Sequence, residues 1–263
     1  MVTLNNKSIL IGIDIFVGNN KLFSQYLIET IRDQSSNGTN RNISATSAHG
    51  IVEANKNPIF LNTLKSFYLN LPDGVPLVWA GRMNGHKKME RCSGVDMFEE
   101  VMISSHNEPI KHFFCGGKPG IADELKQAVN VLFNNNQVVG TYSPPFKKMT
   151  SDEFSFLGGI INKSGANVVW IGLSTPKQEV FAAELSKYCS VNYIITVGAV
   201  FDNFTGHLQR APKFMQQTGL EWLFRLYMEP KRLWKRYAQI IPAFTIIVIK
   251  QKFKSIFNYG DLV

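Results

Sequence analysis

The sequence has little cysteine, no long apolar run and none of the common nucleotide-binding fingerprints. Its three cysteines, Cys92, Cys115 and Cys189, are far apart and form no CxxC pair, which argues against a disulfide framework or a zinc site and favours a reducing compartment. No stretch reaches the roughly 18 apolar residues that a membrane-spanning helix needs. Because GxGxxG and P-loop motifs are absent, dinucleotide or ATP binding has little support, and a nicotinamide-dependent oxidoreductase is disfavoured.

The amino terminus also lacks the marks of a signal peptide. The run "SILIGIDIF" (8–16) has no basic region before it and no small-residue cleavage site after it. A secretory signal needs both features. We therefore expect this run to form a first β-strand.

Positive charge is abundant and unevenly distributed. Residues 206–263 carry ten Lys or Arg against three acids, and so supply seven of the eight net positive charges of the chain. A near-neutral body with a basic carboxy-terminal segment indicates an anionic partner for that segment; a solvated basic helix face is the alternative. Nucleic acid is disfavoured as the partner, because it would leave the apolar stripes of the same segment without a use.

Short β-rich runs alternate with helical patterns over residues 1–205. The predicted strands lie in 8–16, 66–71, 110–117, 136–142, 166–173 and 192–200. Two predicted helices lie in 120–133 and 175–189, with inward faces made of Leu125, Val129 and Leu132 and of Val180, Leu185 and Tyr188. Continuous apolar strands alternating with helices predict an α/β fold, a doubly wound, Rossmann-like and mostly parallel sheet. We expect a catalytic body over 1–205 and a helical appendage over 206–263.

Three of the predicted strands end in turns that suit a ligand, and doubly wound folds bind ligands beyond the carboxyl ends of their strands. Gly116 and Gly117 would let a phosphate approach a helix amino terminus, although a plain turn is the alternative. Lys177 and Gln178 fill the first turn of a helix and could orient a polar ligand. Asp202 is placed to accept from a ribose hydroxyl, or else to cap a helix.

The stretch "NLPDGVPLVWAG" (70–81) sets one acid, Asp73, between a proline and a glycine. A Pro-Asp-Gly turn is the simple interpretation. The other is that the turn holds Asp73 at the mouth of a pocket, where partial burial raises its pKa towards use as a general base.

The carboxy-terminal segment contains three apolar stripes at helical spacing. The stripes comprise Leu220, Leu223, Phe224 and Tyr227, then Leu233, Tyr237 and Ile240 after Pro230, and finally Ile246, Ile249, Phe253 and Ile256. We expect the first stripe to pack on the body, Pro242 to interrupt the second helix, and the last stripe to contact anionic lipid. Burial in a homo-oligomer is the alternative for an exposed apolar appendage.

Six motifs occur in order along nearly the whole chain: "PDGVPLVWAGR", "ERCSGVDMFEE", "GTYSPPF", "GLSTPKQE", "GAVFDNFTG" and "RAPKFMQQTGLEWLFRLYMEPKRLWKRY". Together they resemble the WecG/TagA/CpsF glycosyltransferase family, and the last two are long and specific. The resemblance implies an inverting transferase that moves N-acetylmannosamine or its uronic acid from UDP to a polyprenyl-diphosphate-linked saccharide in surface-polymer assembly. It also implies peripheral attachment to the cytoplasmic face of the bacterial plasma membrane.

Carried over by position, Asp73 resembles the general base of the family. Arg91, Arg225 and Arg232 match arginines that stabilise the departing diphosphate. No cofactor is expected: the usual metal-binding DxD motif is absent, and arginine forks would take the role of the metal. Gln178 resembles a residue that contacts the sugar or acceptor. Asp202 resembles one that contacts the nucleotide.

The segment "SATSAHG" departs from the family pattern of a threonine and an asparagine. Ala45 stands where the threonine is expected and Ser47 where the asparagine is expected, and Thr46 replaces the threonine only if the register shifts. We expect Thr46 and Ser47 to face the donor sugar, and the departure permits another donor such as UDP-glucose. A non-catalytic nucleotide-sugar or membrane-binding protein remains the alternative from a different class. His49 follows as a candidate acceptor-side residue or a structural histidine.

Overall fold

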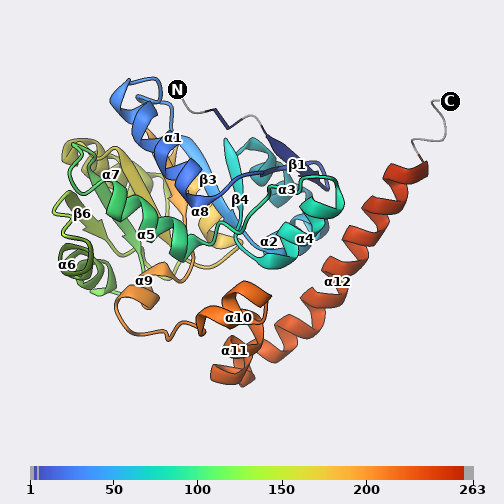
Figure 1. The fold of residues 1–263 in the computed structure, drawn as a ribbon. Coiled ribbons are helices and arrows are strands. Elements are labelled where there is room, and N and C mark those ends of the chain that lie inside the picture. Colours follow the sequence, from blue (N-terminus) through green and yellow to red (C-terminus); the bar gives the residue numbers. More distant parts are fainter. Residues whose placement is uncertain (1–2, 5, 258–263) are drawn as a thin grey trace.

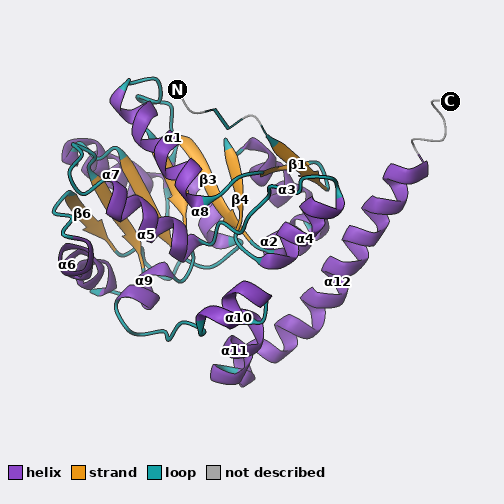
Figure 2. Cartoon of the chain, in the orientation of Figure 1, coloured by secondary structure: helices purple, strands orange, loops and turns teal. Residues whose placement is uncertain are grey.

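The protein is built around one eight-stranded sheet (Figures 1 and 2). The computed structural model describes residues 3–4 and 6–257, with the backbone alone for 254–257. The strand order is β1-β2-β4-β3-β8-β7-β5-β6, and only β1 runs antiparallel to its neighbour. The strands are β1 (Lys7–Leu10), β2 (Ile13–Phe16), β3 (Arg41–Thr46), β4 (Leu69–Pro72), β5 (His112–Gly116), β6 (Val138–Tyr142), β7 (Val168–Gly172) and β8 (Tyr193–Thr196). The predicted doubly wound α/β fold is confirmed.

The first predicted strand is wrong in one respect, because the run 8–16 forms a hairpin rather than a single strand. Ile11 and Gly12 have φ values of 50° and 77° and make a two-residue turn between β1 and β2. Two consecutive residues with positive φ give the turn whose twist matches that of paired strands. The isoleucine at the first position concealed this turn, since a branched side chain is unusual there.

The prediction also omitted β3, a central strand. Its sequence, RNISAT, contains one large aliphatic residue, Ile43, and its hydroxyls are buried instead of exposed. The Thr46 hydroxyl donates to Ser44 Oγ at 2.9 Å and also contacts Asn70 Oδ1 of β4 at 3.2 Å. Hydrogen bonds within β3 and to β4 therefore replace the apolar pattern by which a buried strand is usually recognised.

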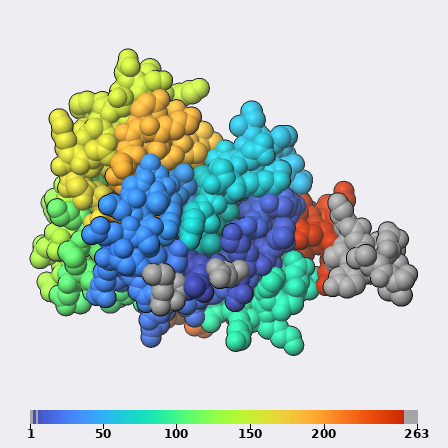
Figure 3. Space-filling view, turned by 90° about the horizontal axis from the view of Figure 1, so that it is seen from above, coloured from blue at the N-terminus to red at the C-terminus, as the bar shows by residue number. Residues whose placement is uncertain are grey.

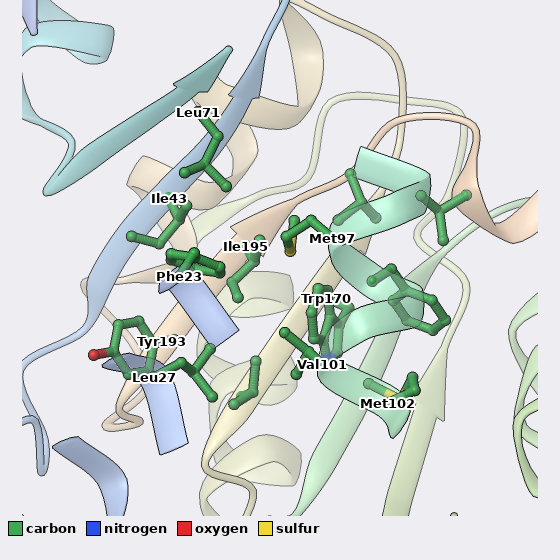
Figure 4. Packing of buried hydrophobic residues seen from close by; sticks show 14 of the residues in the cluster. Phe23, Leu27, Ile43, Leu71, Met97, Val101, Met102, Trp170, Tyr193 and Ile195 are labelled. Atoms are coloured by element: carbon green, nitrogen blue, oxygen red, sulfur yellow. The ribbon is translucent and has the colours of Figure 1, made fainter. Parts of the chain in front are cut away.

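Helices cover both faces of the sheet. The helices of the body are α1 (Asn20–Arg32), α2 (Ala48–Lys56), α3 (Pro58–Ser66), α4 (Val75–Met83), α5 (Gly94–Ser104), α6 (Ile121–Phe133), α7 (Ser151–Ser164), α8 (Lys177–Leu185) and α9 (Val200–Phe204). On one face α1, α5, α6 and α9 pack together, and on the other α3, α7 and α8 do so. Figure 4 shows the core of the first face, where Phe23 and Leu27 of α1 and Met97 and Val101 of α5 meet side chains of the sheet.

Two predicted inward faces are partly wrong. Leu125 and Val129 of α6 are buried as expected, but Leu132 is 57% exposed because it lies in the last turn of the helix. In α8, Leu185 is buried while Val180 is 51% exposed. The buried residues of α8 are Gln178, Glu179, Ala182 and Leu185, so its inward face begins with a polar pair.

The carboxy-terminal segment forms α10 (Lys213–Thr218), α11 (Glu221–Met228) and α12 (Pro230–Phe257). The first two lie beyond the carboxyl ends of the strands, and α12 runs along the edge of the body beside α2 (Figure 1). The prediction that the first stripe packs on the body is wrong: no residue of α11 is buried, and Tyr227 is 81% exposed. The appendage predicted over 206–263 includes residues 258–263, which lie outside the described part of the chain.

Helix α12 continues through Pro242, so the predicted interruption is also wrong. Proline removes one hydrogen bond of a helix, but Ile240 and Phe244 on either side of it are buried against Ile51 and Val52 of α2. Figure 3 shows α12 at the margin of the molecule beside the amino-terminal hairpin, where Gln251 Oε1 accepts from the Ile11 N–H at 2.8 Å. Over residues 3–4 and 6–257, no helix combines the length and the apolar character that crossing a bilayer requires.

Candidate active site

The candidate site lies along the carboxyl ends of β4, β3, β8 and β7. Contacts connect these ends in two groups. The Asp73 N–H donates to Thr46 O at 3.0 Å and Asp73 Oδ1 accepts from the Gly94 N–H, while the Gly198 N–H donates to Gln178 Oε1 at 2.9 Å. Adjacent parallel strands end at one edge of a sheet, and ligands of doubly wound folds bind there. The sequence motifs around Asp73 and Gln178 are thus brought to one edge of the sheet.

Asp73 follows β4 directly and is held by the start of α5. Its Oδ1 accepts from the Gly94 N–H at 2.8 Å, and its backbone carbonyl accepts from Arg91 Nε at 3.1 Å. Although part of the residue reaches solvent, the carboxyl group is enclosed. Burial raises the pKa of Asp73 above the usual carboxyl range, Glu221 acts in the same direction, and the Gly94 N–H, Arg91 and Arg225 oppose the rise. A raised pKa brings a carboxylate towards the working range of a general base.

The raised pKa of Asp73 predicts how activity and stability change with pH. As a base Asp73 must be deprotonated, so the acid limb of kcat/KM should lie above the ordinary carboxyl range, with activity falling as pH drops through the raised pKa. Folding favours the protonated form of such a group, so its stabilisation is full at low pH and lost as pH rises through the folded-state pKa. We therefore expect Asp73→Asn to raise Tm at pH 8 and to leave it unchanged at pH 3. Equal melting shifts at both pH values would contradict this assignment.

Gly94 is required by a close approach between α5 and β8. A Cβ at this position would lie 2.7 Å from the carbonyl oxygen of Val197. We expect Gly94→Ala to push the start of α5 away, to withdraw the N–H from Asp73, and to lower kcat about tenfold together with a loss of about 1–3 kcal/mol in unfolding free energy. Gly159→Ala in α7 is the control, because a Cβ there has open space. Steady-state kinetics measure kcat and denaturant unfolding measures the free energy of unfolding, for both variants. An unchanged kcat in Gly94→Ala would refute the anchoring role of the Gly94 N–H.

Arg91 connects the body to the appendage. Besides its contact with Asp73, its Nη1 donates to the Gln216 carbonyl of α10 at 3.2 Å, and its Nη2 donates to Glu221 Oε2 of α11 at 2.8 Å. The side chain is only 16% exposed. A planar guanidinium can make these separate contacts at once, which a single ammonium cannot. The appendage is thereby fixed next to Asp73.

Arg225 and Arg232 lie on the appendage around Tyr237. The charges of Arg225, Arg236, Glu221 and Arg232 all act on the Tyr237 hydroxyl, whose pKa burial raises. Arg225 Nη2 contacts Glu221 Oε1 one helical turn earlier at 3.4 Å, and Arg232 pairs with Glu229.

A hollow of about 600 Å³ opens beside Arg91, between α4 and α10. Its lining includes Trp79, Arg82, Arg210 and Gln216.

Gln178 is buried rather than open to the site. Its Nε2 donates to Glu179 Oε1 at 2.9 Å and to Thr175 Oγ1 at 3.2 Å, while its Oε1 accepts from Gly198. Glu179 is only 1% exposed; burial raises its pKa, and its Oε2 has no hydrogen-bond partner among the described residues. Sequence reasoning missed Glu179, which looked like an ordinary first-turn acid. These contacts make Gln178 a group that fixes the turn after β8.

The predicted sugar-facing residues have different environments. The hydroxyl of Thr46 is buried between β3 and β4, whereas Ser47 caps α2 through a weak 3.5 Å contact with the Gly50 N–H. Ala45 is also buried, with 7% exposure. His49 lies in the first turn of α2, where burial lowers its pKa and the charge of Arg236 adds to this effect. The appendage therefore reaches this side of the edge as well.

The remaining predicted residues follow β5, β7 and β8. The Gly117 N–H donates to Gly172 O at 3.0 Å, and a Cβ on Gly116 would lie 2.5 Å from that same carbonyl. These glycines thus allow β5 and β7 to meet closely. Lys177 is exposed at the start of α8, and Asp202 is half-buried in the first turn of α9. Across the described part of the chain, no three His, Cys, Asp or Glu side chains gather closely enough to hold a metal ion.

Doubly wound folds bind ligands at the carboxyl edge of the sheet, and arginine forks match the oxygens of phosphate groups. The chain matches the model of the glycosyl transferase WecG/TagA/CpsF family over residues 12–257. It belongs to that family and is a glycosyltransferase by membership. The resemblance found in the sequence motifs is confirmed, and a nucleotide-sugar donor and a glycan acceptor follow from the family.

Proposed function

We propose that this chain is an inverting transferase that moves a hexosamine-type sugar, N-acetylmannosamine or its uronic acid, from UDP to a saccharide carried on a polyprenyl diphosphate. One observation carries the proposal: the enclosed carboxylate of Asp73 is anchored by the Gly94 N–H at 2.8 Å, and Arg91 Nε donates to the backbone carbonyl of the same residue at 3.1 Å. A base and a cation at one strand end are what displacement of a diphosphate by a hydroxyl requires.

In the proposed reaction, Asp73 takes the proton of the acceptor hydroxyl. The hydroxyl oxygen bonds to the anomeric carbon from the face opposite UDP, and the bond from that carbon to the β-phosphate oxygen breaks. Arg91, Arg225 and Arg232 stabilise the charge that develops on the departing diphosphate, because guanidinium forks match phosphate oxygens. Gln178 holds the turn that carries Gly198, and Asp202 is placed for the nucleotide.

The donor sugar is set by the end of β3. With Ala45 buried and Thr46 directed between strands, Ser47 is the hydroxyl nearest the edge from this segment. A serine reaches less far than an asparagine and offers one donor instead of two. This difference leaves UDP-glucose as the second donor candidate.

The test is a transfer assay with purified protein, EDTA and a polyprenyl-diphosphate-linked acceptor. UDP-N-acetylmannosamine and UDP-glucose are offered side by side. We expect turnover with one donor only, unaffected by EDTA because arginines replace the metal. Turnover that EDTA abolishes would overturn the metal-independent mechanism. UDP binding without transfer to any acceptor would favour the non-catalytic alternative.

We also propose that residues 206–263 attach the enzyme peripherally to the cytoplasmic face of the bacterial plasma membrane. The outer face of α12 supports this: Ile246, Ile249 and Phe253 are 52%, 46% and 58% exposed, while Phe244 and Ile247 on the inner face are buried. Apolar side chains next to lysines such as Lys250 suit an anionic lipid surface. A second copy of the chain is the other partner that would cover this stripe.

Replacing Ile246, Ile249 and Phe253 together by serine should release the protein from membranes. We expect binding to phosphatidylglycerol vesicles to fall at least about tenfold, since three apolar side chains no longer enter the lipid. Vesicle co-sedimentation measures this, and Ile103→Ser, an exposed isoleucine of α5 with 49% exposure, is the matched control. Vesicle binding that persists, with loss of a dimer in sedimentation velocity, would assign the stripe to self-association instead.

A further inference from the structure

Glu221 joins two arginines that come from separate parts of the chain. It is the first residue of α11, and its Oε2 accepts from Arg91 Nη2 at 2.8 Å while its Oε1 lies 3.4 Å from Arg225 Nη2. The three side chains are 20%, 16% and 36% exposed. One partly buried carboxylate therefore spans both guanidinium groups.

The same carboxylate is close to the candidate base. Asp73 is affected by four groups around it: Glu221 raises its pKa, and Arg91, Arg225 and the Gly94 N–H lower it. Groups of both charges therefore surround Asp73 before any ligand arrives, and Arg91 Nη2 also lies 3.9 Å from Asp96 Oδ2. A diphosphate entering here meets arginines that already hold an anion.

Carboxylate and phosphate oxygens are alternative partners of a guanidinium fork. The Glu221 carboxylate therefore occupies the position between the two arginines that the oxygens of a phosphate group would take. A diphosphate must either displace Glu221 or bind next to a like charge, which costs affinity.

We propose that Glu221 is the resident counter-ion of the Arg91–Arg225 pair, a positioning residue that a nucleoside diphosphate displaces on binding and that returns as the product leaves. This inference rests on the proposed function, since it takes Arg91 and Arg225 as the diphosphate contacts. It adds that a residue of the appendage weakens nucleotide binding and speeds product release.

We expect the appendage to stay docked without the charge of Glu221, because two other sets of contacts hold it to the body. Arg91 still donates to the Gln216 carbonyl of α10. Helix α12 still buries Leu233, Ile240 and Phe244. The neutral variant Glu221→Gln therefore tests the charge rather than the attachment of the appendage.

The experiment is titration calorimetry of the full chain with UDP and with inorganic pyrophosphate, in EDTA. We expect Glu221→Gln to bind both probes at least about fivefold more tightly than wild type, because a like charge is removed. Glu221→Asp keeps the charge and should stay within about twofold of wild type. Glu108→Gln is the matched control: Glu108 pairs with Arg32 and is 17% exposed, at the opposite edge of the sheet. In turnover, kcat and KM of Glu221→Gln should fall together, because product release slows.

Each result of the titration either supports or overturns the inference about Glu221. Tighter binding in Glu221→Gln alone supports the inference. Equal or weaker binding in Glu221→Gln, with wild type binding UDP normally, overturns it and leaves the proposed function intact. A wild-type chain that binds neither probe overturns both. A Glu221→Gln protein with a melting temperature well below that of wild type would make Glu221 a structural tether, which also overturns the inference.

Discussion

Asp73→Asn should lose most of its transfer activity while it keeps its affinity for UDP. Asparagine cannot take the proton of the acceptor hydroxyl, so we expect kcat to fall by about 10²–10⁴-fold, the usual contribution of a general base. The side-chain oxygen of asparagine can still accept from the Gly94 N–H, which holds Asp73 at 2.8 Å, so the turn should stay in place. The Kd for UDP should change by less than about threefold, since the Asp73 carboxylate accepts from the Gly94 N–H, whereas Glu221 is the carboxylate that contacts both guanidinium groups.

Two controls make this result specific. Asp33→Asn, in an exposed position at the end of α1, should leave kcat unchanged. The lost activity should not return at any pH in Asp73→Asn, whereas wild-type activity should rise through the raised pKa of Asp73. A variant with more than about a tenth of wild-type kcat would remove Asp73 from the role of base.

Arg91→Lys should reduce kcat/KM by about 10²-fold, although it keeps the positive charge. Arg91 donates three hydrogen bonds in different directions: to the Asp73 carbonyl at 3.1 Å, to the Gln216 carbonyl at 3.2 Å and to Glu221 at 2.8 Å. A lysine ammonium can reach only one of these places, so both the fork for the diphosphate and the fixed position of α10 are lost. Kinetics and UDP titration measure the loss of the fork for the diphosphate. The rate of proteolysis between α9 and α10 measures the loss of the fixed position of α10.

Arg32→Lys is the control for Arg91→Lys, because Arg32 makes a surface pair with Glu108 away from the site. Surface pairs contribute at most about 1 kcal/mol, so its activity should match wild type. Near-normal kcat/KM in Arg91→Lys would mean that charge alone is needed at this position. The proposed bidentate contact would then be wrong.

The sequence pattern was sufficient to predict the parallel sheet, because strands such as "ANVVWIGL" are apolar throughout and alternate with helices. It was insufficient for β3, where the buried Thr46 hydroxyl contacts Ser44 of the same strand and Asn70 of β4. A partner such as Asn70 comes from a distant position and leaves no local pattern. The helix through Pro242 is similar, since its stability depends on the burial of Ile240 and Phe244 against α2.

In the candidate site, too, contacts between distant positions of the chain leave no local pattern in the sequence. Asp73 stood out because a lone acid in a Pro-Asp-Gly turn is conspicuous, and the motifs directed attention to Arg91 and Arg225. The role of Gly94 depends on the Val197 carbonyl about a hundred residues away, and that of Glu221 on Arg91 across the interface of body and appendage. Interactions between remote segments are decided by the fold, and only the structure reveals them.

The configuration of the sugar in the product tests the central claim most directly. Wild-type enzyme is supplied with the donor it accepts, labelled with carbon-13 at the anomeric carbon, and the one-bond carbon–proton coupling is measured in donor and product by NMR. A single displacement with Asp73 as base requires inversion of the anomeric carbon in every turnover. Retention would require a covalent intermediate or attack from the face that UDP leaves, and would contradict the mechanism.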